Sequence, residues 1–377
     1  MELSHEDSLR LNVLVKQDLY AVRIDEASMT VHALTAKGEA RVQLNPNCRD
    51  DAYLRRIREL LSTHALGSPG GYPVYLKRWT RMGQMREQSL DSLLILGEPE
   101  AVIAVAHAAG LTEEIARRAW WVMPTAEVAR KMLECANVAN SELGRELAHF
   151  LIEFLPFEAE SFDVVHSVRL VLQPGLIDES IRLGLWKKAA RKSAYYVGFL
   201  YADPKVLPRE LGEHAELPQL LQQLKPLLEK GNSVVTQLVQ VLSGSGQNYL
   251  QTIENALEKI ADQDVMVALL NALQRYFHPT WPDDYTVPYH RLPEEIDQVV
   301  ANVIQANTLP FVQPLSPLMG DDARLKQKVE ALLKLSLVGE PLVNPIFSQT
   351  DAVGSVMRKR LRPVTDWLLV NVALLKS

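Results

Sequence analysis

From residue 88 to about residue 201, the chain repeatedly opens a short amphipathic segment with a helix-capping residue. Thr112 precedes EEIARRAWWVM and Thr125 precedes AEVARKMLECA. A threonine at this place accepts a hydrogen bond from the first turn, and acidic residues in that turn complement the helix dipole. Prolines such as Pro124 and Pro156 separate the segments. Such segments bury their apolar stripes by stacking helix on helix.

This pattern predicts a mostly α fold, an irregular array of helical hairpins similar to HEAT solenoids. No repeat consensus recurs residue for residue, so no named repeat family is indicated. Apolar residues at helical spacing continue in the second half of the chain. The helices predicted there span 218–229, 233–242, 247–276, 294–306, 322–336 and 350–375.

A different periodicity marks residues 11–46, which we expect to form strands. The stretches 19–25, 29–33 and 39–44 alternate apolar side chains with other side chains, as strands with one buried face do. Plausible turn residues separate the three stretches. We therefore predict a small antiparallel β-meander, whose apolar face needs a second layer to cover it.

These patterns divide the chain into three segments. We expect residues 1–48 to form the meander packed on the helices, 49–205 the array of helical hairpins, and 206–377 a second helical region. Three prolines and a change to polar composition mark the last boundary, between residues 203 and 218. A chain of 377 residues with 47% hydrophobic content is long enough for two or three domains.

The stretch GSPGGYPVYLKRWTRMGQ, residues 67–84, suggests a phosphate site because cations follow its glycines. A Walker-type loop needs a strand before it and Lys-Ser/Thr at its end, and a dinucleotide site needs G-x-G-x-x-G after a strand. Neither pattern is present. The glycines are better explained by tight turns with positive φ. We interpret the stretch as a junction between sheet and helices, with a partner-binding loop or an anionic ligand site as alternatives.

Two runs of cations, WKKAARKSAYY (186–196) and MRKRLRP (357–363), concentrate positive charge. Such runs can contact phosphates, but most are solvated helix faces. The formal net charge of −6 argues against general nucleic-acid binding, because counterion release needs a basic face. We therefore do not expect a nucleic-acid partner, and we keep a docking surface for an acidic partner as an alternative interpretation of both runs.

The sequence contains no recognisable catalytic or metal-binding motif. The sequence has no G-x-S-x-G, H-E-x-x-H or C-x-x-C, and Cys48 and Cys135 are too few and too far apart for a disulfide framework or a Cys-based zinc site. The segment HPTWPDDYTVPYH (278–290) contains ligand-type side chains, but their spacing matches no metal signature. We therefore expect no catalytic residue, no bound metal and no cofactor, and favour a protein that is not an enzyme.

The sequence also bears on where the protein is found. Two cysteines suit a reducing cytosol, and the first residues, MELSHED, lack the apolar region of a secretory signal. No run reaches the roughly 18 apolar residues that a membrane span needs. We expect a cytoplasmic protein without a membrane span.

Long stretches of the chain, RVQLNPNCRDDAYLRRIRELLSTHALGSPGGYPVYLKRWTRMGQ (41–84) and LLILGEPEAVIAVAHAAGLTEEIARRAWWVMPTAEVARKMLE (93–134), resemble DsrS proteins. These are encoded with the reverse-acting dissimilatory sulfite reductase genes of sulfur-oxidising bacteria. VRLVLQPGLID (168–178) and KSAYYVGFLYA (192–202) are similar as well. The resemblance covers most of the first 205 residues. It implies a soluble cytoplasmic accessory protein associated with oxidation of stored sulfur, but no known reaction and no catalytic or cofactor residue that can be placed here.

From these features we expect a non-enzymatic accessory or regulatory protein that binds other proteins of the sulfur oxidation pathway. The predicted contact residues are Arg78, Trp79, Arg81 and Trp281. Arginine and tryptophan are enriched in interface hot spots, and loops 67–84 and 278–293 can border a groove of the helical array. The alternative is an enzyme or carrier that acts on a sulfur species or an anionic small molecule through these two loops. That function requires a reactive thiol or a metal, and Cys48 is its candidate thiol.

Overall fold

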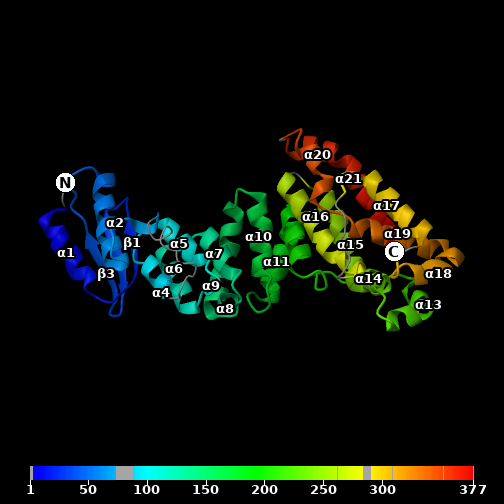
Figure 1. Ribbon diagram of the computed structural model, residues 1–377, viewed down its shortest axis with the longest axis horizontal. Coiled ribbons are helices and arrows are strands. Elements are labelled where there is room, and N and C mark those ends of the chain that lie inside the picture. The colour runs from blue at the N-terminus through cyan, green and yellow to red at the C-terminus, as the bar shows by residue number, and fades with distance from the viewer. Residues whose placement is uncertain are drawn as a thin grey trace. The chain divides into compact units, whose positions relative to one another are not determined.

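The computed structural model describes residues 3–73, 88–260, 262–282, 290–307, 309–350 and 352–376, and the structural findings concern these residues. The fold is mostly helical, with a small antiparallel sheet near the N-terminus (Figure 1), as the sequence pattern predicts. The chain divides into two compact units, Met1–Phe154 and Leu155–Ser377. Their boundary lies within the predicted segment 49–205, whereas the proline-rich change of composition after residue 203 lies inside the second unit.

Helices account for most of both units. In the first unit the described helices are α1 (His5–Val15), α2 (Asp50–Leu66), α4 (Gln88–Leu93), α5 (Pro99–Ala106), α6 (Glu113–Val122), α7 (Ala126–Leu133), α8 (Ala136–Ala139) and α9 (Glu142–Phe154). In the second unit they are η1 (Leu155–Phe157), α10 (Ser161–Val171), α11 (Glu179–Ala189), α12 (Ser193–Ala202), α13 (Leu217–Glu229), α14 (Ser233–Leu242), α15 (Gly244–Leu257), α16 (Gln263–Phe277), η2 (His278–Thr280), α17 (Pro293–Ala306), η3 (Gln313–Leu315), α18 (Ser316–Asp321), α19 (Ala323–Ser336), η4 (Glu340–Leu342), α20 (Asn344–Phe347) and α21 (Gly354–Leu375).

The predicted meander is confirmed. Strands β1 (Leu19–Asp25), β2 (Thr30–Thr35) and β3 (Gly38–Gln43) form an antiparallel sheet in the order β1-β2-β3. Apolar side chains of the sheet, α1 and α2 pack into one core, which supplies the covering layer that the sheet needs. The edge of β1 is also occupied, since the Val22 N–H donates to the carbonyl of Leu94 at 2.8 Å.

The start of the first unit differs from the prediction. Strands were expected from residue 11, but α1 continues to Val15. The helix forms because the Ser4 hydroxyl accepts from the Asp7 N–H, which caps it, and because Leu11, Leu14 and Val15 lie on one buried face. The α1 face that carries Leu11 packs in the core under the sheet.

Most helix ends follow the local signals in the sequence. The predicted caps Thr112 and Thr125 are confirmed, because each hydroxyl accepts a hydrogen bond from the first turn of its helix. The stretch NPNCRDDAYLRRIRELLSTHALG (45–67) predicts a helix with Asp50 or Asp51 as its cap and Gly67 as its end. Helix α2 does end at Gly67, where φ is 69°. Its start differs from the prediction, since Arg49 occupies the N-cap position and makes no side-chain cap.

One predicted helix is two helices. The sequence predicts a single helix over residues 247–276, whereas α15 ends at Leu257 and α16 begins at Gln263. The break is stabilised by Asp262, whose carboxylate accepts from the Val265 N–H at 2.9 Å and so caps α16.

A partly buried polar cluster joins α13 to α19 in the second unit. The Lys328 ammonium lies 2.9 Å from one carboxylate oxygen of Glu216, and Arg324 lies 3.0 Å from the other. The hydrogen bond from Lys328 is the main reason that the pKa of Glu216 lies below its usual value. Burial lowers the pKa of the neighbouring His214, whose Nδ1 accepts from the Glu216 N–H at 3.1 Å. This cluster fixes α19, on which α21 packs.

Within the described ranges, we find no helix that combines the length and the apolar character required to cross a bilayer.

Candidate interaction surface

The residues predicted to contact a partner fall into two groups. Arg78, Trp79 and Arg81 lie outside the described residues, and their role stays a prediction. Trp281 is only 3% exposed. Its indole N–H donates to the Ser336 hydroxyl at 2.7 Å, and its ring packs edge-on against Phe311 with the centroids 5.3 Å apart. In this structure Trp281 is therefore a core residue of the second unit and offers no surface to a partner.

In the described part of the glycine-rich stretch, up to Pro73, two backbone N–H groups next to the glycines are bound within the protein. The Gly71 N–H donates to the buried Ser62 hydroxyl at 2.8 Å, and the Tyr72 N–H donates to a Glu98 carboxylate oxygen at 2.9 Å. A phosphate cradle needs such N–H groups free for its ligand. Here a carboxylate of the same chain takes one of them, which supports a structural junction over an anion site for these residues.

Gly71 is expected to be required for this junction. Its φ is +61°, and a Cβ there would collide with the Glu98 carboxylate. We expect Gly71→Ala to lower the free energy of unfolding by about 1 to 3 kcal/mol, because a left-handed backbone and a displaced carboxylate both cost energy. Gly67→Ala is the matched control, since its φ of +69° is similar but its Cβ would meet no atom within 4 Å. Urea unfolding should show the larger loss for Gly71→Ala, and equal losses would contradict a role for Glu98.

Groups that could bind a metal do not assemble in the described residues. No cluster of three or more His, Cys, Asp or Glu side chains is present among them. Of the ligand-type side chains in the 278–290 segment, Asp283 and Asp284 lie outside the described residues. Cys48 and Cys135 are both unpaired and half-buried.

Helix α21 contacts the second unit through one apolar face. Its buried residues recur at helical spacing: Met357, Leu361, Val364, Leu368, Asn371, Val372 and Leu375. Polar contacts hold its C-terminal half, where the Trp367 indole N–H donates to Asp297 at 3.2 Å and the Gln247 amide donates to the Leu375 carbonyl at 3.0 Å. One face of α21 is therefore packed on the second unit, and the opposite face is exposed to solvent.

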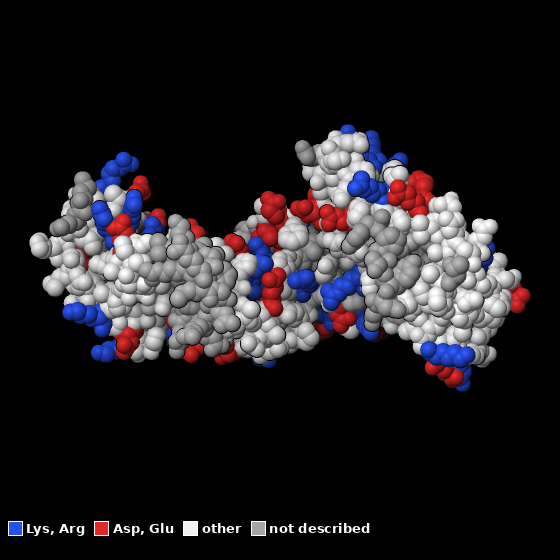
Figure 2. All heavy atoms as spheres, viewed as in Figure 1, with Lys and Arg blue, Asp and Glu red and all other residues white. Residues whose placement is uncertain are grey.

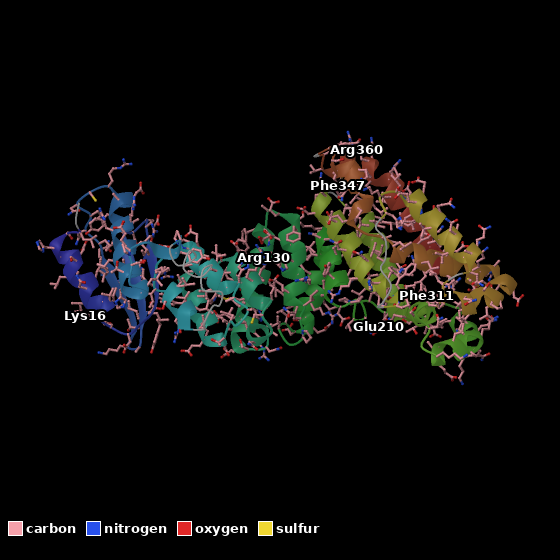
Figure 3. The ribbon with its side chains drawn as sticks, viewed as in Figure 1. Lys16, Arg130, Glu210, Phe311, Phe347 and Arg360 are labelled. Atoms are coloured by element: carbon pink, nitrogen blue, oxygen red, sulfur yellow. The ribbon has the colours of Figure 1, made fainter. Side chains whose placement is uncertain are left out.

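Four cations lie along the N-terminal half of this helix: Arg358, Lys359, Arg360 and Arg362. All four are exposed, and none has an ion-pair partner within the part of the chain that the structure describes. Lys and Arg atoms gather where α20 leads into α21 (Figure 2), and Arg360 is labelled at this end of the unit in Figure 3.

The four cations do not stabilise the helix that carries them. Arg358 and Arg362 are four residues apart, and two like charges at this spacing cost a helix about 0.2 to 0.5 kcal/mol. The first turn of α21 contains no acidic side chain that could offset them. Since the fold gains nothing from this cluster, its charge is available to a partner.

The other basic run has a structural explanation. Lys187 and Lys188 occupy the last turn of α11. Cations at a helix C-terminus interact favourably with the helix dipole, typically by about 0.3 to 1 kcal/mol each. Arg191 and Lys192 follow directly after this helix. Position on the helix therefore distinguishes two runs that look alike in sequence.

Two exposed valines lie at the start of α21, next to the four cations in sequence. Val353 is 68% exposed and Val356 is 52% exposed. We call these two valines and the four cations the α21 surface. Sequence reasoning missed the valines, because Val353 lies four residues before the buried Met357 and so matches the apolar stripe. Its backbone, with φ −123° and ψ 168°, is extended, which takes Val353 out of the helical stripe.

Comparisons with known proteins do not assign the chain to a family. No family model, no curated protein and no solved structure matches it.

Proposed function

We propose that this chain is a non-enzymatic accessory protein that binds an acidic protein partner through the α21 surface. The observation that carries the proposal is the set of four exposed cations that have no ion-pair partner among the described residues. We also propose that the partner belongs to a dissimilatory sulfur oxidation pathway. Support for this context comes from the resemblance of residues 41–84 and 93–134 to DsrS proteins.

An acidic protein segment fits the α21 surface better than a nucleic acid does. The chain as a whole has a net charge of −6, so its surface outside the α21 surface repels a long polyanion such as a nucleic acid. Arginine binds carboxylates with two parallel hydrogen bonds, which gives both affinity and orientation. The exposed Val353 and Val356 add the apolar contact that is common at the centre of protein interfaces. The expected partner segment therefore combines Asp or Glu with aliphatic side chains.

Replacing all four cations of the α21 surface with glutamine (R358Q/K359Q/R360Q/R362Q) should weaken partner binding about 10- to 100-fold. Each exposed charge pair contributes about 0.2 to 1 kcal/mol, so four pairs contribute about 0.8 to 4 kcal/mol, and the expected loss of about 1.4 to 2.8 kcal/mol lies in the middle of this range. The partner is first identified by crosslinking in sulfur-oxidising cells and mass spectrometry. It is then purified and titrated calorimetrically at low and high salt, and wild-type affinity should fall as salt rises.

The matched control neutralises the other basic run (K187Q/K188Q/R191Q/K192Q). It changes the net charge by the same amount and should keep wild-type affinity. If both variants bind equally well, the α21 surface is not the docking site. If the purified partner has no acidic segment, the proposed chemistry is wrong, and if it has no link to sulfur oxidation, only the proposed pathway is wrong.

A further inference from the structure

A pocket of about 550 Å³ lies within the second unit and shares no residue with the α21 surface. Its walls come from α12, the segment after α12, the end of α13, α14 and α16. Small-molecule sites in proteins usually measure about 300 to 1,000 Å³. The pocket therefore has the size of a site for a small organic molecule.

The pocket walls are largely apolar. Aliphatic side chains from three helices contribute to them, among them Leu200, Leu228 and Val239. Tyr201 and Tyr276 add aromatic surface. None of the described residues that line the pocket is an aspartate or a glutamate. These walls suit the apolar body of a ligand and add no acidic side chain that would repel a negative charge.

Two cations, Lys205 and Arg275, also line the pocket, and both are exposed. Among the described residues neither side chain has an ion-pair partner. The Arg275 guanidinium lies 5.7 Å from the centroid of the Tyr201 ring, so it is held beside an aromatic wall. A ligand whose apolar body enters the pocket can thus place an anionic group between Lys205 and Arg275.

Tyr276 provides a second polar feature of this pocket. Its ring stacks on Tyr249 with the centroids 3.8 Å apart, and its carbonyl accepts from the Gln237 amide at 2.8 Å. Its hydroxyl is covered from solvent, and the Gln240 side chain, which also lines the pocket, lies near enough to lower its pKa. Burial is the larger effect and raises the pKa of Tyr276 well above its usual value, so the hydroxyl stays protonated.

We propose that this pocket binds a small organic anion with a flat apolar body, such as an aromatic sulfonate or carboxylate. The apolar body lies against Tyr201 and the aliphatic walls. The anionic group lies between Lys205 and Arg275. This binding site is independent of the proposed partner and of the α21 surface.

Two fluorescent probes test the site. The aromatic sulfonate 8-anilinonaphthalene-1-sulfonate has the required anionic group, and N-phenyl-1-naphthylamine is the same ring system without it. Both are titrated into the folded full-length protein. The sulfonate should bind at one saturable site. Lys205→Gln and Arg275→Gln should each weaken its binding about fivefold, and the double variant about 25-fold, because each removes one charge-assisted contact.

The neutral probe shows how much of the binding affinity depends on the anionic group and how much on the fit of the ring system. The two glutamine variants should leave its affinity unchanged, whereas Thr236→Trp, at an exposed position that lines the pocket, should abolish binding of both probes. K187Q/K188Q is the control for loss of two exposed cations and should bind both probes like the wild type. Circular dichroism verifies the fold of every variant. Non-saturable binding, equal weakening of both probes by Arg275→Gln, or binding that Thr236→Trp does not change would overturn the proposal.

Discussion

Replacing Trp281 with alanine is expected to lower the free energy of unfolding by about 3 to 5 kcal/mol, the usual cost of removing a buried tryptophan. The side chain is 3% exposed, so its loss leaves a cavity. The change also removes the edge-on contact with Phe311 and the hydrogen bond to the Ser336 hydroxyl. Urea unfolding followed by far-UV circular dichroism measures this loss.

Trp281→Phe is the matched control, because it keeps an aromatic ring against Phe311 and loses only the indole N–H and part of the volume. We expect it to cost less than half as much as the alanine variant. One outcome would return Trp281 to the role predicted from the sequence, that of a partner contact. If Trp281→Ala leaves stability unchanged and weakens partner binding, Trp281 is a contact residue and its buried position here is wrong.

Gly198→Ala is expected to lower the free energy of unfolding by about 2 to 3 kcal/mol, in the range of overpacked cores. Gly198 lies in α12 where this helix crosses α10. A Cβ at this position would lie 2.6 Å from both Cβ and Cγ1 of Val168 and 3.1 Å from the carbonyl oxygen of Val165. These atoms belong to the α10 backbone or lie next to it and cannot move aside, so the two helices would have to separate.

Gly184→Ala is the control, and it should change the free energy of unfolding in the opposite direction. Gly184 also lies inside a helix, α11, but a Cβ there would meet no atom within 4 Å. Alanine favours a helix over glycine by about 0.8 to 1 kcal/mol, so this variant should be more stable than the wild type. Thermal unfolding of the two variants compares them directly. Stabilisation by both changes would show that α10 and α12 do not approach as closely as described.

Much of the secondary structure could be predicted because its signals are local. The threonine caps at positions 112 and 125 and the helix end at Gly67 involve contacts within a few residues, and all three are confirmed. The alternation of the three strands is local as well. The predictions failed at α1 and at the break after α15, where a capping residue, Ser4 or Asp262, begins a helix that periodicity did not reveal.

The candidate interaction surface was less predictable. The cations of residues 357–363 were visible as a run, and a docking surface for an acidic partner was one interpretation of it. The sequence could not distinguish this run from the one at residues 186–196. Position on the helix made that distinction, since cations of both runs are exposed. Trp281 was selected for its residue type, which describes interfaces on average and contains no information on burial.

The sequence by itself determined that this protein is mostly helical with an N-terminal meander, because helix periodicity, strand alternation and caps depend on neighbours along the chain. Tertiary structure alone decided which side chains meet the solvent. Trp281 is buried by Phe311 and Ser336, and α12 approaches α10 because Gly198 has no side chain. These contacts join residues far apart in the sequence, and burial and charge pairing are properties of such contacts.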